Sequence, residues 1–167
     1  MIASQGRLEL LSDPVARQLL ESTGPARVAY TALDGTPRVV PIWFHWTGEE
    51  LVMASPETAP KIRALRQSPR VAVTVDKESF PYRVLLLRGD ATVEWVHGVP
   101  AEYAAAAQRY FGPQQGSAWV DQVSRPGMRM ARIAVRPDWV RVLDFETRFP
   151  AALARHLESA SLEEVER

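Results

Sequence analysis

Short apolar runs separated by turn residues dominate the first half of the chain. Residues 27–33 are β-prone, and Asp34-Gly35 predicts a hairpin turn into a second β-prone run over residues 36–46. Residues 47–49 predict another turn, into a strand that ends at Ser55. Because connections this short join antiparallel neighbours, we expect a three-stranded meander.

Three further runs predict the rest of the sheet. Residues 70–76 form a fourth strand, residues 82–96 a fifth with a bulge or bend at Gly89-Asp90, and residues 128–145 a sixth with a bulge or edge position at Pro137-Asp138. The pattern therefore predicts a mainly β protein, an antiparallel six-stranded split β-barrel with peripheral helices. Connections of two or three residues exclude a doubly wound parallel sheet.

Helical spacing appears between these runs. Helices are predicted over residues 13–22, where Asp13-Pro14 marks the start, over residues 101–111, and over residues 151–166. Residues 114–126 are harder to interpret and predict at most one more helical turn. A short helix is also expected after Ser55, in the segment that connects the third and fourth strands.

That short helix has an apolar face and a capped start. Thr58 can cap it with its hydroxyl, Pro60 suits its first turn, and Ile62 and Leu65 lie three positions apart on the face that would pack on a sheet. A capped surface helix with a solvated lysine is the common outcome of such a pattern.

The same segment also suits a phosphate. The N-terminal end of the helix points free N–H groups outward, and Ser55, Thr58 and Lys61 add two hydroxyls and a cation beside them. We therefore carry two interpretations of this segment, a plain surface helix and an anion site.

The run 38–46 is apolar on both faces. Alternation places Val40, Ile42 and Phe44 on one face and Val39, Pro41, Trp43 and His45 on the other, so both faces are expected to be buried or occupied. Since proline cannot donate a ladder hydrogen bond, Pro41 predicts an edge strand or a wall for a ligand's ring system. A core strand with one face against a second copy of the chain is an equally good and compatible explanation.

Composition narrows the possibilities. The chain has 167 residues and 46% hydrophobic content, so one core is expected: a single domain over residues 1–167, with its core at about 13–145 and a helical tail at 146–167. Twenty basic and twenty acidic residues cancel, which gives no electrostatic reason to expect nucleic acid or a membrane as partner. With no cysteine and no long apolar run, a cytoplasmic location is expected.

Familiar catalytic patterns are missing from the sequence. It has no Gly-rich dinucleotide or phosphate-loop motif, and no serine in a nucleophile-elbow context. His45, His97 and His156 lie far apart, so no metal site is predicted, and His45 is expected to be a hydrogen-bonded strand residue. No catalytic residue is predicted.

Three motifs in order resemble a known family. They are Asp34-Gly35-Thr36-Pro37, Pro41-Ile42-Trp43-Phe44, and the run 61–73 with its lysine, short helix and Pro-Arg-Val entry into the next strand. Together they resemble the pyridoxamine 5'-phosphate oxidase-like, FMN-binding split-barrel family, also called the flavin/deazaflavin oxidoreductase superfamily. The resemblance covers residues 17–145.

The resemblance implies a homodimer with two cofactor sites at the subunit interface, an oxidoreductase activity, and a small-molecule substrate. The cofactor is FMN or, alternatively, the 8-hydroxy-5-deazaflavin coenzyme, factor 420. Carried over by position, Lys61 contacts the cofactor phosphate with help from Ser55 and Thr58, and the ring is bordered by strand residues. The predicted ring-side residues are Pro41, Ile42 and Trp43, and Arg38 is a further predicted cofactor-binding residue.

One departure from the family pattern affects the activity. The oxidase proper usually carries a serine and an arginine just ahead of the lysine, where this chain has Ala59 and Pro60. Specific oxidation of pyridoxamine phosphate is therefore not expected, and Pro41-Ile42-Trp43 looks more like the deazaflavin-using members. The alternative function is a non-catalytic split barrel that binds flavin, haem or a tetrapyrrole. Phe80, Tyr82 and Trp119 either roof the site or pack on the surface.

Overall fold

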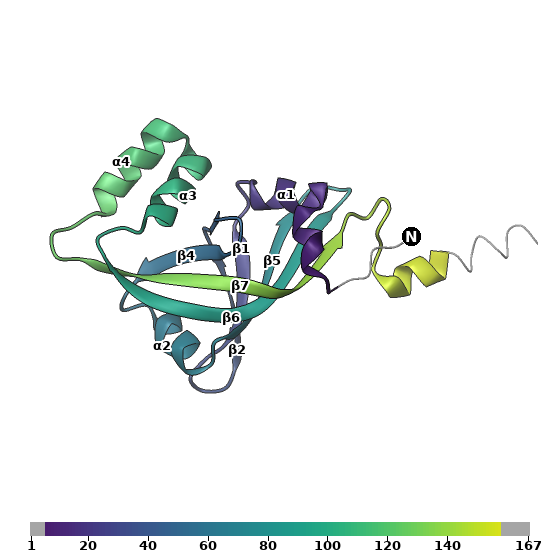
Figure 1. Cartoon of the computed structure of the whole chain (residues 1–167), viewed down its shortest axis with the longest axis horizontal. Helices are drawn as coiled ribbons and strands as arrows, with labels where there is room; N and C mark the ends of the chain where they lie inside the picture. The colour runs from purple at the N-terminus through teal and green to yellow at the C-terminus, as the bar shows by residue number, and fades with distance from the viewer. Residues whose placement is uncertain (1–5, 158–167) are drawn as a thin grey trace, which may run out of the picture.

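The computed structural model describes residues 6–157 and shows a long curved sheet with helices at its periphery (Figure 1). The strands are β1 (Ala26–Thr31), β2 (Pro37–Ile42), β3 (His45–Trp46), β4 (Leu51–Pro56), β5 (Arg70–Lys77), β6 (Arg83–His97) and β7 (Arg129–Leu143). The helices are the 3-10 turn η1 (Leu8–Ser12), α1 (Pro14–Leu20), α2 (Pro60–Gln67), α3 (Ala101–Phe111) and α4 (Pro113–Val123). A further helical stretch covers residues 151–157. The part of the predicted C-terminal helix beyond residue 157 lies outside the described residues.

All seven strands form one antiparallel sheet in the order β2-β1-β5-β6-β7-β4-β3. The mainly β prediction with peripheral helices is confirmed, whereas the count of six strands is wrong. The predicted strand over 36–46 is divided at Trp43 and Phe44, which lie outside both β2 and β3. The three-stranded meander is wrong for the same reason, since β2 pairs with β1 and β4 pairs with β7.

The two edges of the sheet are consecutive in the chain. β2 and β3 are the edge strands, yet only two residues separate Ile42 from His45, so a span of roughly 10 Å joins the edges. β3 pairs His45 with Val52, and extending that ladder by three residues would place Ile42 opposite Ser55. Instead, Ile42 pairs with Ala26 and the sheet is not closed by hydrogen bonds. We call this place, between β2 and β4, the split.

Local signals placed most helices correctly. The Asp13 side chain accepts the N–H of Val15 at 2.9 Å and caps α1, which begins at Pro14 as predicted. α3 covers the predicted residues 101–111. α4 is a full helix of 11 residues where at most one turn was predicted, because its sequence offers neither a side-chain N-cap nor a strong apolar stripe.

The two long strands bend where they were expected to. The β6–β7 register shifts at Arg88/Gly89, where Gly89 faces Pro137 and Arg88 faces Trp139, so Asp138 is the extra residue of a bulge. Gly89 is required here, because a Cβ at this position would lie 2.4 Å from the carbonyl oxygen of Arg136. The bulge bends both strands around the core.

The core lies inside this curved sheet and beneath α1 and α2. Phe44, Leu51, Leu85 and Val140 are fully buried at its centre. Ile62 and Leu65 of α2 are buried, with exposed fractions of 1% and 2%, as their spacing predicted. α2 is therefore fixed to the sheet by its apolar face, which leaves the remaining faces for other contacts.

α3 and α4 approach each other most closely at Gly116. A Cβ there would lie 2.5 Å from the Gln108 Cα and 2.7 Å from the Ala107 carbonyl carbon. We expect Gly116→Ala to lower the free energy of unfolding by about 1–3 kcal/mol, because overpacking outweighs the better helix propensity of alanine. Chemical denaturation checks this, with Gln115→Ala, at an exposed position of α4, as control. Equal stability of the two variants would contradict a tight α3–α4 contact.

Candidate cofactor site

The site predicted around α2 begins with an unusual helix start. Ala59 occupies the N-cap position with no side-chain hydrogen bond, and Pro60 is the first helical residue. The predicted cap by Thr58 is therefore wrong, and Thr58 is exposed beside the helix instead. Pro60 has no N–H and the Ile62 N–H donates to the carbonyl oxygen of Ala59 at 2.9 Å, so of the first three helical residues Lys61 is the one whose N–H is left for a ligand.

Lys61 follows directly in the first turn of α2 and is half-buried. Among residues 6–157, no carboxylate or carbonyl pairs with its ammonium group. Burial lowers the pKa of Lys61, since desolvation disfavours its charged form. A half-buried cation with no anionic partner fits a bound phosphate better than it fits a plain surface helix.

The surroundings of Lys61 contain one neutralised carboxylate. Glu57, in the turn before α2, accepts two hydrogen bonds from Arg129 at 2.6 and 2.9 Å. Because Arg129 occupies it, Glu57 does not compete with an anion for Lys61. Ser55 lies just before this turn, buried in β4 opposite Ala131.

β2 was predicted to form the ring wall, and it is an exposed edge strand. Val40 and Ile42, which the alternation placed on one face, pack against the core. On the other face, Val39 is 64% exposed and Pro41 is exposed as well. An uncovered apolar edge of this kind suits a flat ligand or a second chain.

Arg38 and Trp43 already have partners at the two ends of β2. Arg38 is exposed and donates to Asp34 at 3.3 Å in the hairpin turn. Trp43 is half-buried under α3 and α4, where its ring stacks on Tyr110 with centroids 5.1 Å apart and meets the edge of Phe111 at 5.0 Å.

The rings around Trp43 form one cluster. Its members are Trp43, Tyr103, Tyr110, Phe111 and Trp119. Trp119 also donates to the Tyr103 hydroxyl at 2.9 Å. The aromatic cluster therefore covers one side of Trp43. Tyr103, Tyr110 and Phe111 lie on α3, which was predicted, but their contact with Trp43 joins distant segments and was missed from sequence.

The aromatic residues of the β5–β6 loop are elsewhere. Phe80 is 72% exposed and meets the edge of Tyr82, which in turn meets the edge of Phe145. Trp119 thus packs beside Trp43, whereas Phe80 and Tyr82 form a separate surface row.

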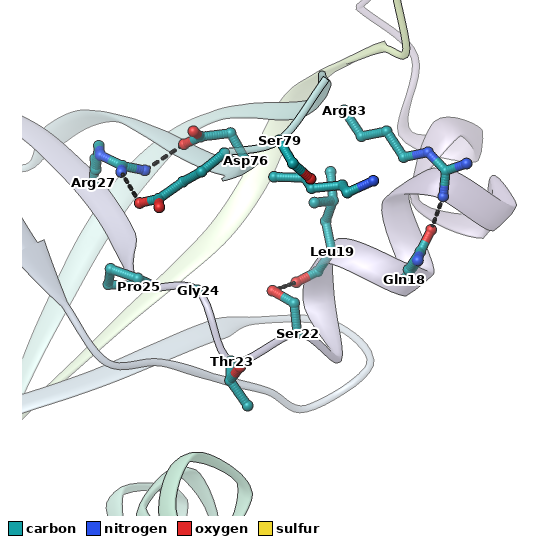
Figure 2. Close-up of a pocket in the computed structure, with 12 residues that line it drawn as sticks. Gln18, Leu19, Ser22, Thr23, Gly24, Pro25, Arg27, Asp76, Ser79 and Arg83 are labelled. Atoms are coloured by element: carbon teal, nitrogen blue, oxygen red, sulfur yellow. Dashed lines mark hydrogen bonds and ion pairs between the residues drawn. The ribbon is translucent and has the colours of Figure 1, made fainter. Parts of the chain in front are cut away.

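A cavity of about 480 Å³ lies between the α1–β1 turn and the end of β5 (Figure 2). Arg27 pairs with Asp76 across it, and Arg83 donates to Gln18 at its rim. None of the predicted site residues lines this cavity.

Within the described residues, no group of three histidine, aspartate or glutamate side chains is placed to hold a metal ion. In that same part of the chain, none of the helices combines the length and apolar character needed to cross a bilayer.

Comparison with known families identifies the chain. Residues 12–144 match the family model described as pyridoxamine 5'-phosphate oxidase. The chain belongs to this family. The fold therefore agrees with the resemblance drawn from its motifs. Comparison with curated proteins gives no significant match.

Solved structures of similar fold include several family-like proteins. One named F420 reductase shares 29% identity, over 75% of this chain and 94% of that chain, with a TM-score of 0.58. A conserved hypothetical protein from Mycobacterium tuberculosis shares 18% identity, over 86% and 91% of the two chains, with a TM-score of 0.66. A heme binding protein from Mycobacterium smegmatis shares 19% identity, over 80% of this chain and 54% of that chain, with a TM-score of 0.57. The last two likenesses show the fold alone.

Proposed function

We propose that this family member is a flavin- or deazaflavin-dependent oxidoreductase whose Lys61 holds the phosphate of the cofactor. The observation that carries the proposal is the half-buried ammonium of Lys61, which has no anionic partner among the described residues. The side chains of Ser55 and Thr58 and the backbone N–H of Lys61 are proposed to complete the phosphate site. The cofactor supplies the hydride chemistry when bound.

The ring is proposed to lie along β2. Pro41 and Val39 offer an exposed apolar surface, and Pro41 has no N–H that would need a ladder partner. Ile42 and Ser55 stand on the two sides of the split, so the ring and the phosphate would be held by neighbouring parts of one surface. Arg38 is proposed to leave its contact with Asp34 and to reach the same surface. Breaking this contact costs little free energy, because both side chains are exposed.

A second copy of the chain is proposed to cover this surface. Residues that face each other in antiparallel ladders share a side of the sheet, and one such row is Val39, Ala29, Ala72 and Arg88. The row begins at a valine that is 64% exposed, and its alanines present a flat surface. The proposed homodimer would bury this face and close the cofactor site from the other side.

Of the two cofactors, we favour the 8-hydroxy-5-deazaflavin coenzyme, factor 420, over FMN. The F420 reductase structure shares 29% identity over 94% of its length. Ala59 and Pro60 also supply neither a hydroxyl nor a cation to the phosphate, in contrast to the oxidase pattern. The proposed substrate is a small organic molecule bound on the open face of the ring.

Absorbance and titration test this choice. The purified protein is expected to be colourless and to shift the fluorescence of added factor 420 at micromolar concentration. A yellow preparation with flavin absorbance bands supports FMN instead. Failure to bind either cofactor at that concentration contradicts the proposed function as a whole.

A second candidate function is non-catalytic binding of flavin, haem or a tetrapyrrole. It is favoured by the reduced phosphate site at Ala59 and Pro60 and by the shared fold with the heme binding protein. Anaerobic reduction of the bound cofactor, followed by addition of an electron acceptor, separates the two functions. An oxidoreductase loses the reduced signal, whereas a storage protein keeps it.

A further inference from the structure

Arg109 of α3 connects two chain segments that are distant in sequence. Its Nε donates to the carbonyl oxygen of Ser22 at 3.0 Å, and its terminal nitrogen donates to the carbonyl oxygen of Phe44. The guanidinium carbon also lies 4.8 Å from the centre of the Phe44 ring and 5.2 Å from that of Tyr110. One side chain thus binds the turn after α1 and the link between β2 and β3.

The Phe44 carbonyl is a special acceptor. Phe44 lies between β2 and β3, outside the ladders of both edges, while its side chain is fully buried. A carbonyl at such a position has no strand partner, so a guanidinium supplies the hydrogen bond that the sheet does not.

Tyr110, the next residue on α3, reinforces the same contact. Its hydroxyl donates to the carbonyl oxygen of Gly24 at 2.9 Å, and its ring stacks on Trp43 at 5.1 Å. Arg109 and Tyr110 therefore hold residues 22–24 and 43–44 together from one helix. We call this pair the α3 clamp.

The position of the link controls the split. The link residues Trp43 and Phe44 decide how far the end of β2 at Ile42 stands from β3 and β4. The proposed ring surface on β2 and the proposed phosphate site beyond β4 lie on the two sides of that split. A change at the link would therefore alter ring contacts before it altered phosphate contacts.

We infer that Arg109 is a positioning residue for the cofactor ring: through the Phe44 carbonyl it sets the β2 edge against which the ring lies. This inference rests on the proposed function and deepens it. The hydrogen bonds and ring contacts of Arg109 go to Ser22, Phe44 and Tyr110, so its effect on the ring is transmitted through the backbone of the link.

The charge of Arg109 also affects the pKa of a neighbouring histidine. Burial and the positive charge of Arg109 lower the pKa of His45, while Glu102 opposes them. His45 begins β3, one residue after the Phe44 carbonyl. Its titration therefore gives a local readout of whether the guanidinium stays at the link.

The test compares Arg109→Gln and Arg109→Lys with the wild type in four titrations. The probes are FMN and riboflavin, and factor 420 and its phosphate-free counterpart 8-hydroxy-5-deazariboflavin. One of the two pairs of probes is expected to bind. We expect Arg109→Gln to weaken the binding of both members of that pair about tenfold, and each by the same factor. Arg109→Lys, which keeps the charge and one donor, is expected to restore part of the affinity. The pKa of His45, followed by NMR, should rise in Arg109→Gln only.

A matched control is Arg125→Gln. Arg125 also donates to two carbonyl oxygens, those of Gln122 and Ser124, but both belong to the end of α4, directly before Arg125 in the chain. We expect it to leave all four affinities unchanged. Thermal unfolding of each variant shows which of them is folded at the titration temperature.

The outcomes separate the inference from the proposed function. If the wild type binds a cofactor and Arg109→Gln binds it equally well, the positioning role is wrong and the proposed function stands. If Arg109→Gln weakens only the phosphate-bearing probe, Arg109 acts on the phosphate and the inference is also wrong. If the wild type binds none of the four probes, both are overturned.

Discussion

Lys61→Ala is expected to weaken binding of FMN or factor 420 by about 10- to 100-fold. A hydrogen bond to a charged group contributes about 1.5–3 kcal/mol, and each 1.4 kcal/mol is about a tenfold change in affinity. Riboflavin and the phosphate-free deazaflavin should bind the variant and the wild type alike. Isothermal titration with each pair of probes measures both effects.

The lysine variant should not be less stable. Burial lowers the pKa of Lys61, so keeping its side chain protonated in the folded state costs free energy near neutral pH. Removing it is expected to leave the free energy of unfolding unchanged or slightly higher. Arg63→Ala, an exposed position on the same helix, is the control and should keep full cofactor affinity. Equal losses of cofactor affinity in Lys61→Ala and Arg63→Ala would contradict the proposed contact between Lys61 and the phosphate.

Asp144→Asn is expected to lower the free energy of unfolding by about 3 kcal/mol near neutral pH. The Asp144 carboxylate is 5% exposed and accepts the backbone N–H groups of Glu146, Thr147 and Arg148 at 2.6–3.0 Å. It also accepts the Arg148 Nε at 3.0 Å, and Arg148 in turn reaches Asp13 at 2.5 Å. The network ties the segment after β7 to the cap of α1.

The effect should depend on pH with a definite sign. Burial by itself raises the pKa of Asp144, but the hydrogen bonds from Thr147, Glu146 and Arg148 outweigh it and hold the pKa far below its usual range. The stabilisation is therefore fully present above the unfolded pKa of about 3.9 and is lost as pH falls below it. Urea unfolding at several pH values measures this.

The variant and the wild type should accordingly converge in acid. At pH 7 we expect the full difference between them, and near pH 2 a smaller one. Asp121→Asn, at an exposed position on α4, serves as control and should show no such pH dependence. A stability difference that stays constant from pH 7 to pH 2 would contradict the charge-based explanation.

Several features of the site were predictable because they depend on local sequence. The spacing of Ile62 and Leu65 predicted which face of α2 is buried, and so placed Lys61 at the border of that face. Gly89 and Pro137 predicted the bulge, because a close backbone approach and a missing donor are properties of single residues. The family resemblance followed from motifs of the same local kind.

Other features of the site did not follow from residue type or spacing. Thr58 has the chemistry of a cap, yet the helix begins one residue later at Pro60, because the backbone at Ala59 is extended. Trp43 was expected to border the cofactor ring, and the structure also places it against Tyr110, a partner 67 positions away in sequence. No spacing rule links such residues.

The alternation of apolar and polar residues by itself determined that this protein is mainly β and where most strands lie, since these depend on side-chain direction along one strand. Only the tertiary structure decided which strands pair. The division of residues 36–46 at Trp43 and Phe44 sends β2 and β3 to opposite edges of one sheet, and Arg109 holds that division in place. The free energy that selects this arrangement comes from burying Phe44 and satisfying its carbonyl, and neither is visible in the pattern of a single strand.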